Sequence, residues 1–316
     1  MKKFALKCLL FFILILSSIG ILNYLYIKTN YWHNTVAIRK FKNVPEHIQL
    51  ANVGSSHGVR SFNYSNVPYI NFNFALTSQR FLYDYAILKQ YIARFEKNAV
   101  LLIPISYFQI TGIRTNFRDQ RARYYYFLDR EYMDFYSKQE KILFTVVPIM
   151  TAGNTIRFII KDQKPVTASL GTMKEPELIK YCIKKHKSWT NNRKSDIKAR
   201  EEIFTKNKYL VSQIIDLCYA NNIQPVLVST PITSVLNKIY MEKTPDFFDD
   251  FYRFTRELRE AYPNLPYFDY SHDPRFENDF SLFKDGDHLN IFGAEKFTAI
   301  VIADLQSSGL LSIHSP

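Results

Sequence analysis

The stretch Ala51-Asn52-Val53-Gly54-Ser55-Ser56-His57-Gly58 decides the fold. Residues 48–53 form an apolar run that predicts a buried strand, and this run leads directly into a glycine and two serines. Open α/β folds bind their ligands at the carboxyl ends of strands, where backbone N–H groups are free to stabilise an anion. A serine in that position is a candidate nucleophile if a base can reach it.

The far end of the chain offers such a base in the block 283–290, which reads Phe-Lys-Asp-Gly-Asp-His-Leu-Asn. Asp285 and His288 are three residues apart on a turn, so the carboxylate can lie behind the imidazole while the other ring nitrogen faces outward. Asp269 and His272 have the same spacing, but no long helix follows them. Asp287 is an alternative orienting group, although an immediate neighbour is less well placed to reach behind the ring.

These two blocks resemble those of the SGNH/GDSL hydrolase superfamily. Gly54-Ser55-Ser56-His57 stands in the position of its Gly-Asp-Ser-Leu block, and Asp285-x-x-His288 resembles its terminal block. The chain is most similar to the membrane-anchored branch that includes relatives of the D-alanyl transfer protein of teichoic acids and of the alginate acetylation proteins. The resemblance extends over residues 48–308 and implies a flavodoxin-like three-layer α/β sandwich with a central parallel sheet.

The resemblance also implies roles for individual residues. Ser56 is the expected nucleophile, with Ser55 as the alternative one position away, and His288 and Asp285 complete the triad. His57, next to the nucleophile, is expected to support the site or to contact substrate.

The oxyanion hole departs from the family pattern. Ser78 occupies the place of the glycine in the second block, 71–79, where Asn73 is a candidate substrate contact. The Gly-x-Asn-Asp block has no counterpart, and Ser106 is the candidate replacement for its asparagine. The expected oxyanion donors are therefore Ser56, Ser78 and Ser106.

Composition limits the classes of function. With 316 residues, of which 47% are hydrophobic, the chain is long enough to bury one large α/β core. A formal charge of +12 favours anionic partners such as phospholipid headgroups or acidic glycans. Nucleic-acid motifs, phosphate-binding glycine loops and His/Cys clusters at ligand spacing are absent from the sequence, so no nucleic acid, cofactor or metal is expected.

Residues 8–27 carry no charge and follow three lysines. This run would span about 30 Å as a helix, the thickness of a bilayer core. A cleaved signal peptide is the alternative, but no Ala-x-Ala site follows the run. We therefore expect a single uncleaved anchor in the cell membrane, with the body outside the cytoplasm.

The expected organisation is an anchor at 1–28, a stalk at 29–46 and a hydrolase-like domain at 47–311, with a helical insert at about 112–199. Arg121 and Arg123 in the insert are candidate contacts for sugars or anionic groups, and the alternative is a structural helical cover. The basic run 184–187 has two interpretations, a solvated face or a membrane contact. Outside the insert, apolar runs predict strands at 99–105, 223–230 and 267–271, alternating with helices.

Two functions follow from these features. The first is a serine esterase or O-acyltransferase acting on a cell-surface or exported polysaccharide, together with a membrane-bound acyl-transfer partner. The second is a non-catalytic anchored module that binds a polysaccharide or an assembly partner.

Overall fold

The structure is a computed structural model that describes residues 2–110, 121–133, 135–151, 155–160, 173–193 and 197–312. The chain forms two compact units. Unit 1 comprises Met1–Val44 and Asn116–Thr167, and unit 2 comprises Pro45–Thr115 and Ala168–Pro316.

Unit 2 contains a five-stranded parallel sheet in the order β2-β1-β3-β4-β5. Its strands are β1 (Ile48–Asn52), β2 (Asn71–Asn73), β3 (Phe95–Pro104), β4 (Gln224–Ser229) and β5 (Tyr267–Asp269). The strand order reverses at β1, because β2 lies on one side of it and β3 on the other. Ligands of open parallel sheets bind at such a switch point, outside the carboxyl ends of the strands.

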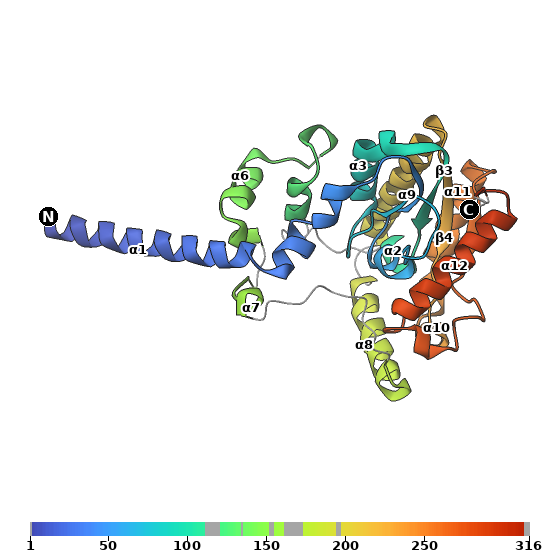
Figure 1. Ribbon diagram of the computed structural model, residues 1–316. Coiled ribbons are helices and arrows are strands. Elements are labelled where there is room, and N and C mark those ends of the chain that lie inside the picture. The colour runs from blue at the N-terminus through green and yellow to red at the C-terminus, as the bar shows by residue number, and fades with distance from the viewer. Residues whose placement is uncertain are drawn as a thin grey trace. The chain divides into compact units, whose positions relative to one another are not determined.

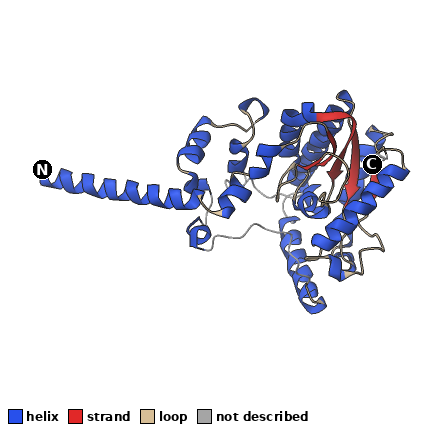
Figure 2. Cartoon of the chain, viewed as in Figure 1, coloured by secondary structure: helices blue, strands red, loops and turns tan. Residues whose placement is uncertain are grey.

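Helices cover the sheet (Figures 1 and 2). The helices of unit 2 are α2 (Ser56–Ser61), α3 (Phe81–Tyr91), α4 (Tyr107–Ile110), α8 (Glu175–Arg193), α9 (Ile197–Ala220), α10 (Ser234–Lys243), α11 (Asp249–Ala261) and α12 (Ile291–Ser307). Short 3-10 turns complete this unit: η3 (Ile92–Arg94), η7 (Pro245–Phe248) and η8 (Phe280–Leu282).

The two faces of the sheet pack against different helices. Phe297, Val301 and Leu305 of α12 share a buried cluster with the strand residues Leu50, Val100, Leu102, Val226 and Val228. Each fully buried side chain of this kind stabilises the fold by about 1.5–3 kcal/mol. Strand side chains alternate between faces, and α9 contacts α3, α11 and β4 on the other side.

The described residues of unit 1 are helical. They form α1 (Lys2–Ile27), η1 (Trp32–Val36), η2 (Arg39–Asn43), η4 (Arg123–Tyr126), η5 (Arg130–Tyr132), α6 (Lys138–Val146), η6 (Pro148–Thr151) and α7 (Thr155–Ile160). Tyr26, Trp32 and Val36 form its buried cluster. Among the described residues, α1 is the one helix long and apolar enough to cross a membrane, and none of its apolar stretch is buried.

The predicted α/β class, its parallel sheet and the amino-terminal apolar helix are confirmed. The strand β2 was not predicted, because three half-buried residues show no alternation. Residues 29–44 belong to the same compact unit as the first part of the predicted insert, and Trp32 contacts Tyr126 of η4 with ring centroids 4.9 Å apart. Parts of the predicted insert (112–120, 134, 152–154, 161–172 and 194–196) lie outside the described residues.

Candidate active site

The structure brings together Ser56, His288 and Asp285. The Oγ atom of Ser56, the first residue of α2, lies 2.9 Å from Nε2 of His288. The Nδ1 atom of the same ring lies 2.9 Å and 3.1 Å from the two carboxylate oxygens of Asp285. A hydroxyl, an imidazole and a carboxylate in this order can activate an oxygen nucleophile.

The turn that presents Ser56 is held by a buried carboxylate. Gly54 has a backbone φ of +114°, which residues other than glycine rarely adopt. Its N–H donates to Asp84 Oδ1 at 2.8 Å. Gln79 Nε2 donates to the same oxygen at 2.6 Å. Asp84, which sequence reasoning missed, is fully buried on α3 and so ties this helix to the strand end.

The helix that starts at Ser56 packs closely against the strand end. A Cβ atom at Gly58 would lie 2.5 Å from the Val53 carbonyl oxygen and 2.7 Å from the Cβ of Ala75, so only glycine fits without a shift. The Gly58 carbonyl accepts hydrogen bonds from Asn52 Nδ2 at 3.2 Å and from Asn73 Nδ2 at 2.9 Å. These contacts fix the start of α2 relative to β1 and β2.

The loop that carries Asp285 and His288 is closed by backbone hydrogen bonds. Lys284 N donates to the His288 carbonyl at 2.8 Å, and the Gly286 carbonyl accepts from N and Oγ1 of Thr233 at 2.9 Å and 3.0 Å. Asn290 caps α12 by accepting from Gly293 N at 3.0 Å. The loop that carries His288 is thus held at both ends.

A second buried carboxylate, that of Asp287, lies beside the triad. Its Oδ1 is 3.2 Å from His288 Nδ1, and its Oδ2 is 3.5 Å from His57 Nε2. Lys185 Nζ, on α8, contacts Asp287 Oδ1. Nδ1 of His57 lies 3.2 Å from the Thr230 hydroxyl, and the ring of His57 stacks on that of His288 with centroids 4.8 Å apart.

This cluster separates the pKa values of the two histidines. Burial lowers the pKa of His288, but Asp287 and Asp285 beside it outweigh burial and raise the pKa to about 9. Burial, together with the neighbouring His288 and Lys185, lowers the pKa of His57 to about 3 despite the opposing effect of Asp287. Burial raises the pKa of Asp287, yet Lys185 and the two histidines hold it well below its usual value. At neutral pH the site therefore contains a charged His288, a neutral His57 and an ionised Asp287.

Other groups in the cluster are less suited to chemistry. The Cys182 thiol is buried against Gly286, and burial and Asp287 raise its pKa to about 12, so it is not a thiolate nucleophile at neutral pH. One ligand atom each from His57, Asp287 and His288 lies within 4.8 Å of the others, a spacing that suits a metal ion. The ammonium group of Lys185 on Asp287 disfavours a cation at that carboxylate.

We expect Lys185→Met to lower the free energy of unfolding by about 3 kcal/mol, since it removes the ammonium group from the buried carboxylate of Asp287 and leaves only His288 to offset its charge. Chemical denaturation of the chain in detergent measures the change. Lys184→Met is the matched control, because Lys184 is exposed on the same helix and should change stability little.

The double variant Lys185→Met/Asp287→Asn should recover part of the lost stability, because it removes both charges. Strict additivity of the two single changes would contradict a coupled Lys185–Asp287 pair.

The expected oxyanion residues lie along the same edge of the sheet. Ser106 is buried just after β3, and Ser78 is half-buried in the loop before α3 with φ +60°. Asn73, the candidate substrate contact, uses its side chain locally: its Oδ1 accepts from Ala75 N at 3.0 Å, besides the bond from its Nδ2 to Gly58. His57 is likewise buried in the cluster described above.

Arg121 and Arg123, predicted to contact substrate, belong to unit 1 and make contacts within it. Arg121 pairs with Glu140 of α6. Arg123 is buried, and its Nη2 donates to the Tyr124 hydroxyl at 2.9 Å. Their role in substrate binding stays a prediction.

The competing residues differ from the triad in their contacts. Asp269 Oδ1 accepts from N and Oγ of Ser271, at 3.0 Å and 2.5 Å, while His272 is exposed. Within the described residues it is Ser56, not Ser55, whose hydroxyl lies within hydrogen-bond distance of His288.

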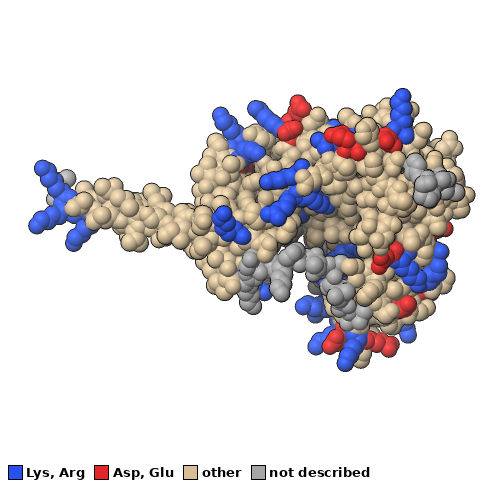
Figure 3. Space-filling view, in the orientation of Figure 1, with Lys and Arg blue, Asp and Glu red and all other residues tan. Residues whose placement is uncertain are grey.

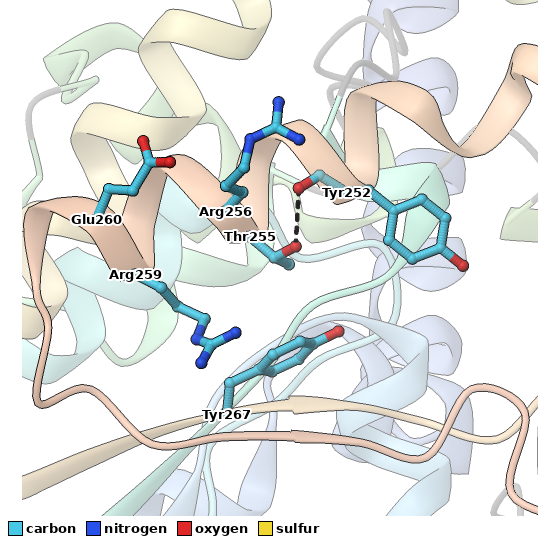
Figure 4. A pocket seen from close by; sticks show the side chains of 6 residues that line it. All are labelled: Tyr252, Thr255, Arg256, Arg259, Glu260 and Tyr267. Atoms are coloured by element: carbon cyan, nitrogen blue, oxygen red, sulfur yellow. Dashed lines mark hydrogen bonds between the residues drawn. The ribbon is translucent and has the colours of Figure 1, made fainter.

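A surface groove with a volume of about 430 Å³ lies between α11 and β5 (Figure 4). It is lined by Tyr252, Thr255, Arg256, Arg259, Glu260 and Tyr267. None of the triad residues lines it, so its arginines and tyrosines take no part in the arrangement around Ser56.

No family model matches the chain, and a search of curated proteins finds no match.

Proposed function

We propose that the protein is a membrane-anchored serine acyl esterase or O-acyltransferase that acts on a cell-surface or exported polysaccharide. The observation that carries the proposal is the 2.9 Å separation between Ser56 Oγ and His288 Nε2, with Asp285 on the other ring nitrogen. Such a chain of groups serves acyl transfer in unrelated folds.

The position of Ser56 in the sheet supports the same proposal. The serine follows β1, next to the point where the strand order reverses, and the order β2-β1-β3-β4-β5 is that of flavodoxin-like sheets. The blocks around Ser56 and His288 resemble those of the SGNH/GDSL hydrolases, whose branch of polymer-modifying membrane proteins suggests the substrate class.

In the proposed reaction Ser56 Oγ attacks the acyl carbonyl carbon while its proton passes to His288 Nε2. The resulting imidazolium faces Asp285 and Asp287, which stabilise its charge. The C–O bond to the leaving alcohol breaks as His288 returns the proton to that oxygen. Water or a glycan hydroxyl then attacks the acyl-enzyme by the reverse sequence, which gives hydrolysis or transfer.

The oxyanion would be held by the backbone N–H groups of Ser56 and Ser78, with the Ser106 hydroxyl as the third donor. Each such donor contributes about 3 kcal/mol to transition-state stabilisation. Ser78 already has the left-handed backbone, φ +60°, that a glycine in its place would adopt without strain.

The surface location rests on α1. The helix has 26 residues, which corresponds to about 39 Å, and none of its apolar stretch is buried. In the proposal it is a single anchor that leaves the body outside the cytoplasm, where acylated polymers and a membrane-bound acyl donor are available.

Labelling by a fluorophosphonate probe tests the nucleophile. We expect the folded chain to form a covalent adduct at Ser56, identified by peptide mass spectrometry, and to hydrolyse p-nitrophenyl acetate. A folded chain that forms no adduct and releases no p-nitrophenol would favour the non-catalytic module that binds a polysaccharide or an assembly partner.

The labelling rate should depend steeply on pH. The raised pKa of His288 keeps Nε2 protonated at neutral pH, and only the neutral ring can take the Ser56 proton. The rate should therefore rise about tenfold per pH unit and level off near pH 9. Ser56→Ala measures the background reaction of the probe. A midpoint at or below the ordinary histidine value would contradict the role of the two carboxylates.

A further inference from the structure

Unit 1 exposes apolar side chains in a regular pattern. On α6, Ile142 and Val146 are four residues apart, and on α7, Ile156 and Ile160 have the same spacing. Residues at this spacing lie on one side of a helix. These four side chains and that of Met150 on η6 are 54–75% exposed. Exposed apolar side chains that recur on one side of a helix are typical of a face that contacts a membrane or a partner.

The opposite sides of the same helices hold unit 1 together. Phe144 of α6 is fully buried, and Phe158 and Ile159 of α7 pack on the cluster of Tyr26, Trp32 and Val36. The exposed side chains are therefore not needed for the core of the unit.

These helices are attached to the carboxyl end of α1. Ile149 N donates to Asn23 Oδ1 of α1 at 3.0 Å, and α1 contacts both η6 and α7. Tyr31 stacks on Phe158, with ring centroids 3.6 Å apart. The exposed apolar side chains thus belong to elements next to the carboxyl end of α1. The helix α1 itself carries no charged residue after the lysines at its amino-terminal end (Figure 3).

We propose that α6, η6 and α7 form a collar that lies in the interface of the lipid bilayer crossed by α1. In this collar Ile142, Val146, Met150, Ile156 and Ile160 contact the acyl chains. Amphipathic helices bury such faces about 5–10 Å into the boundary between headgroups and acyl chains. The proposal rests on the membrane anchor and is independent of the acyl chemistry.

Lipid is the favoured occupant for two reasons. The elements η6 and α7 contact α1, the helix that the proposed anchor places in the bilayer, and α6 contacts η6. Exposed cations accompany it, Lys28 beside α1, Lys138 on α6 and Arg157 on α7, and these suit anionic headgroups.

Environment-sensitive fluorescence in vesicles of phosphatidylcholine and phosphatidylglycerol tests the collar. Each variant is the full chain with Cys8→Ala and one further change to cysteine. The two remaining native cysteines, Cys182 and Cys218, are buried and should not react with the probe. The changes are Ile142→Cys, Ile156→Cys, Leu14→Cys and Tyr209→Cys, each labelled with a nitrobenzoxadiazole probe. Tyr209, exposed on α9 of unit 2, is the aqueous control, and Leu14 reports on the anchor.

We expect blue-shifted emission at 142 and 156, quenched most by lipids brominated near the headgroup end of the acyl chain. The probe at 14 should be quenched more deeply and the probe at 209 not at all. Water-like, unquenched emission at 142 and 156 with a quenched probe at 14 overturns the collar alone. An unquenched probe at 14 overturns the anchor and the collar together. Blue-shifted emission at 142 and 156 without bromine quenching also overturns it, because a protein partner would then cover this face.

Discussion

Ser56→Ala should lower the turnover of an acyl ester by about 10³- to 10⁶-fold, because it removes the hydroxyl that carries the acyl group in the proposed reaction. The residual rate would come from binding and from the oxyanion donors. Steady-state kinetics on p-nitrophenyl acetate measure the loss, and circular dichroism checks that the variant folds.

Ser55→Ala is the matched control for this change. Ser55 precedes the proposed nucleophile by one residue, yet it is Ser56 that contacts His288. The control should keep most of the activity. If Ser55→Ala loses activity and Ser56→Ala keeps it, the nucleophile is the neighbouring serine; if both stay active, the protein is better described as a binding module.

Asp285→Asn should reduce kcat/KM by about 10²- to 10⁴-fold. The amide would place an NH2 group near His288 Nδ1 and favour the tautomer whose Nε2 carries a proton and cannot accept one from Ser56. The loss of kcat/KM should be smaller than in a triad with a single carboxylate, because Asp287 Oδ1 also lies 3.2 Å from His288 Nδ1.

Adding Asp287→Asn separates the two carboxylates. The double variant should lose more activity than Asp285→Asn, and its pH–rate midpoint should fall from about 9 toward the ordinary histidine value. A double variant as active as Asp285→Asn would show that Asp287 does not support the base.

Much of the sheet was predictable from the sequence, because β1, β4 and the second half of β3 are apolar runs buried by helices. The short strand β5 is only partly buried and was recognised from its place after the predicted helix 247–262. The block of Asp285 and His288 was recognised from its spacing, since a turn of three residues brings the side chains together whatever the rest of the fold. Ser56 and His288 are brought together by the complete sheet. The distance between them therefore could not be predicted from the local sequence around either residue.

The sequence named Asp287 only as an alternative to Asp285, because neighbouring side chains on an extended chain point apart. The chain bends at residues 284–287, and the carboxylates of both Asp285 and Asp287 lie near Nδ1 of His288.

Two charged residues were missed although the sequence carried a signal for each. Lys185 belongs to a basic run, but it continues the buried helical stripe of Leu178 and Cys182, whereas Lys184 and Lys187 are exposed. Asp84 is an acidic group among the apolar positions of α3. A charge on the apolar face of a helix needs a partner, which here is Asp287 for Lys185 and the Gly54 amide for Asp84.

The close packing at Gly58 limits how this protein can vary. Gly54 is fixed by its backbone angle and Gly58 by lack of room for a methyl group, so the positions two residues before and two residues after Ser56 admit little besides glycine. In a library of random substitutions, positions 54 and 58 should therefore be depleted of every other amino acid even when selection is for correct folding alone. Ser56 itself should vary freely under that selection. The library would therefore distinguish the glycines, which are required for folding, from Ser56, which is required only for the proposed reaction.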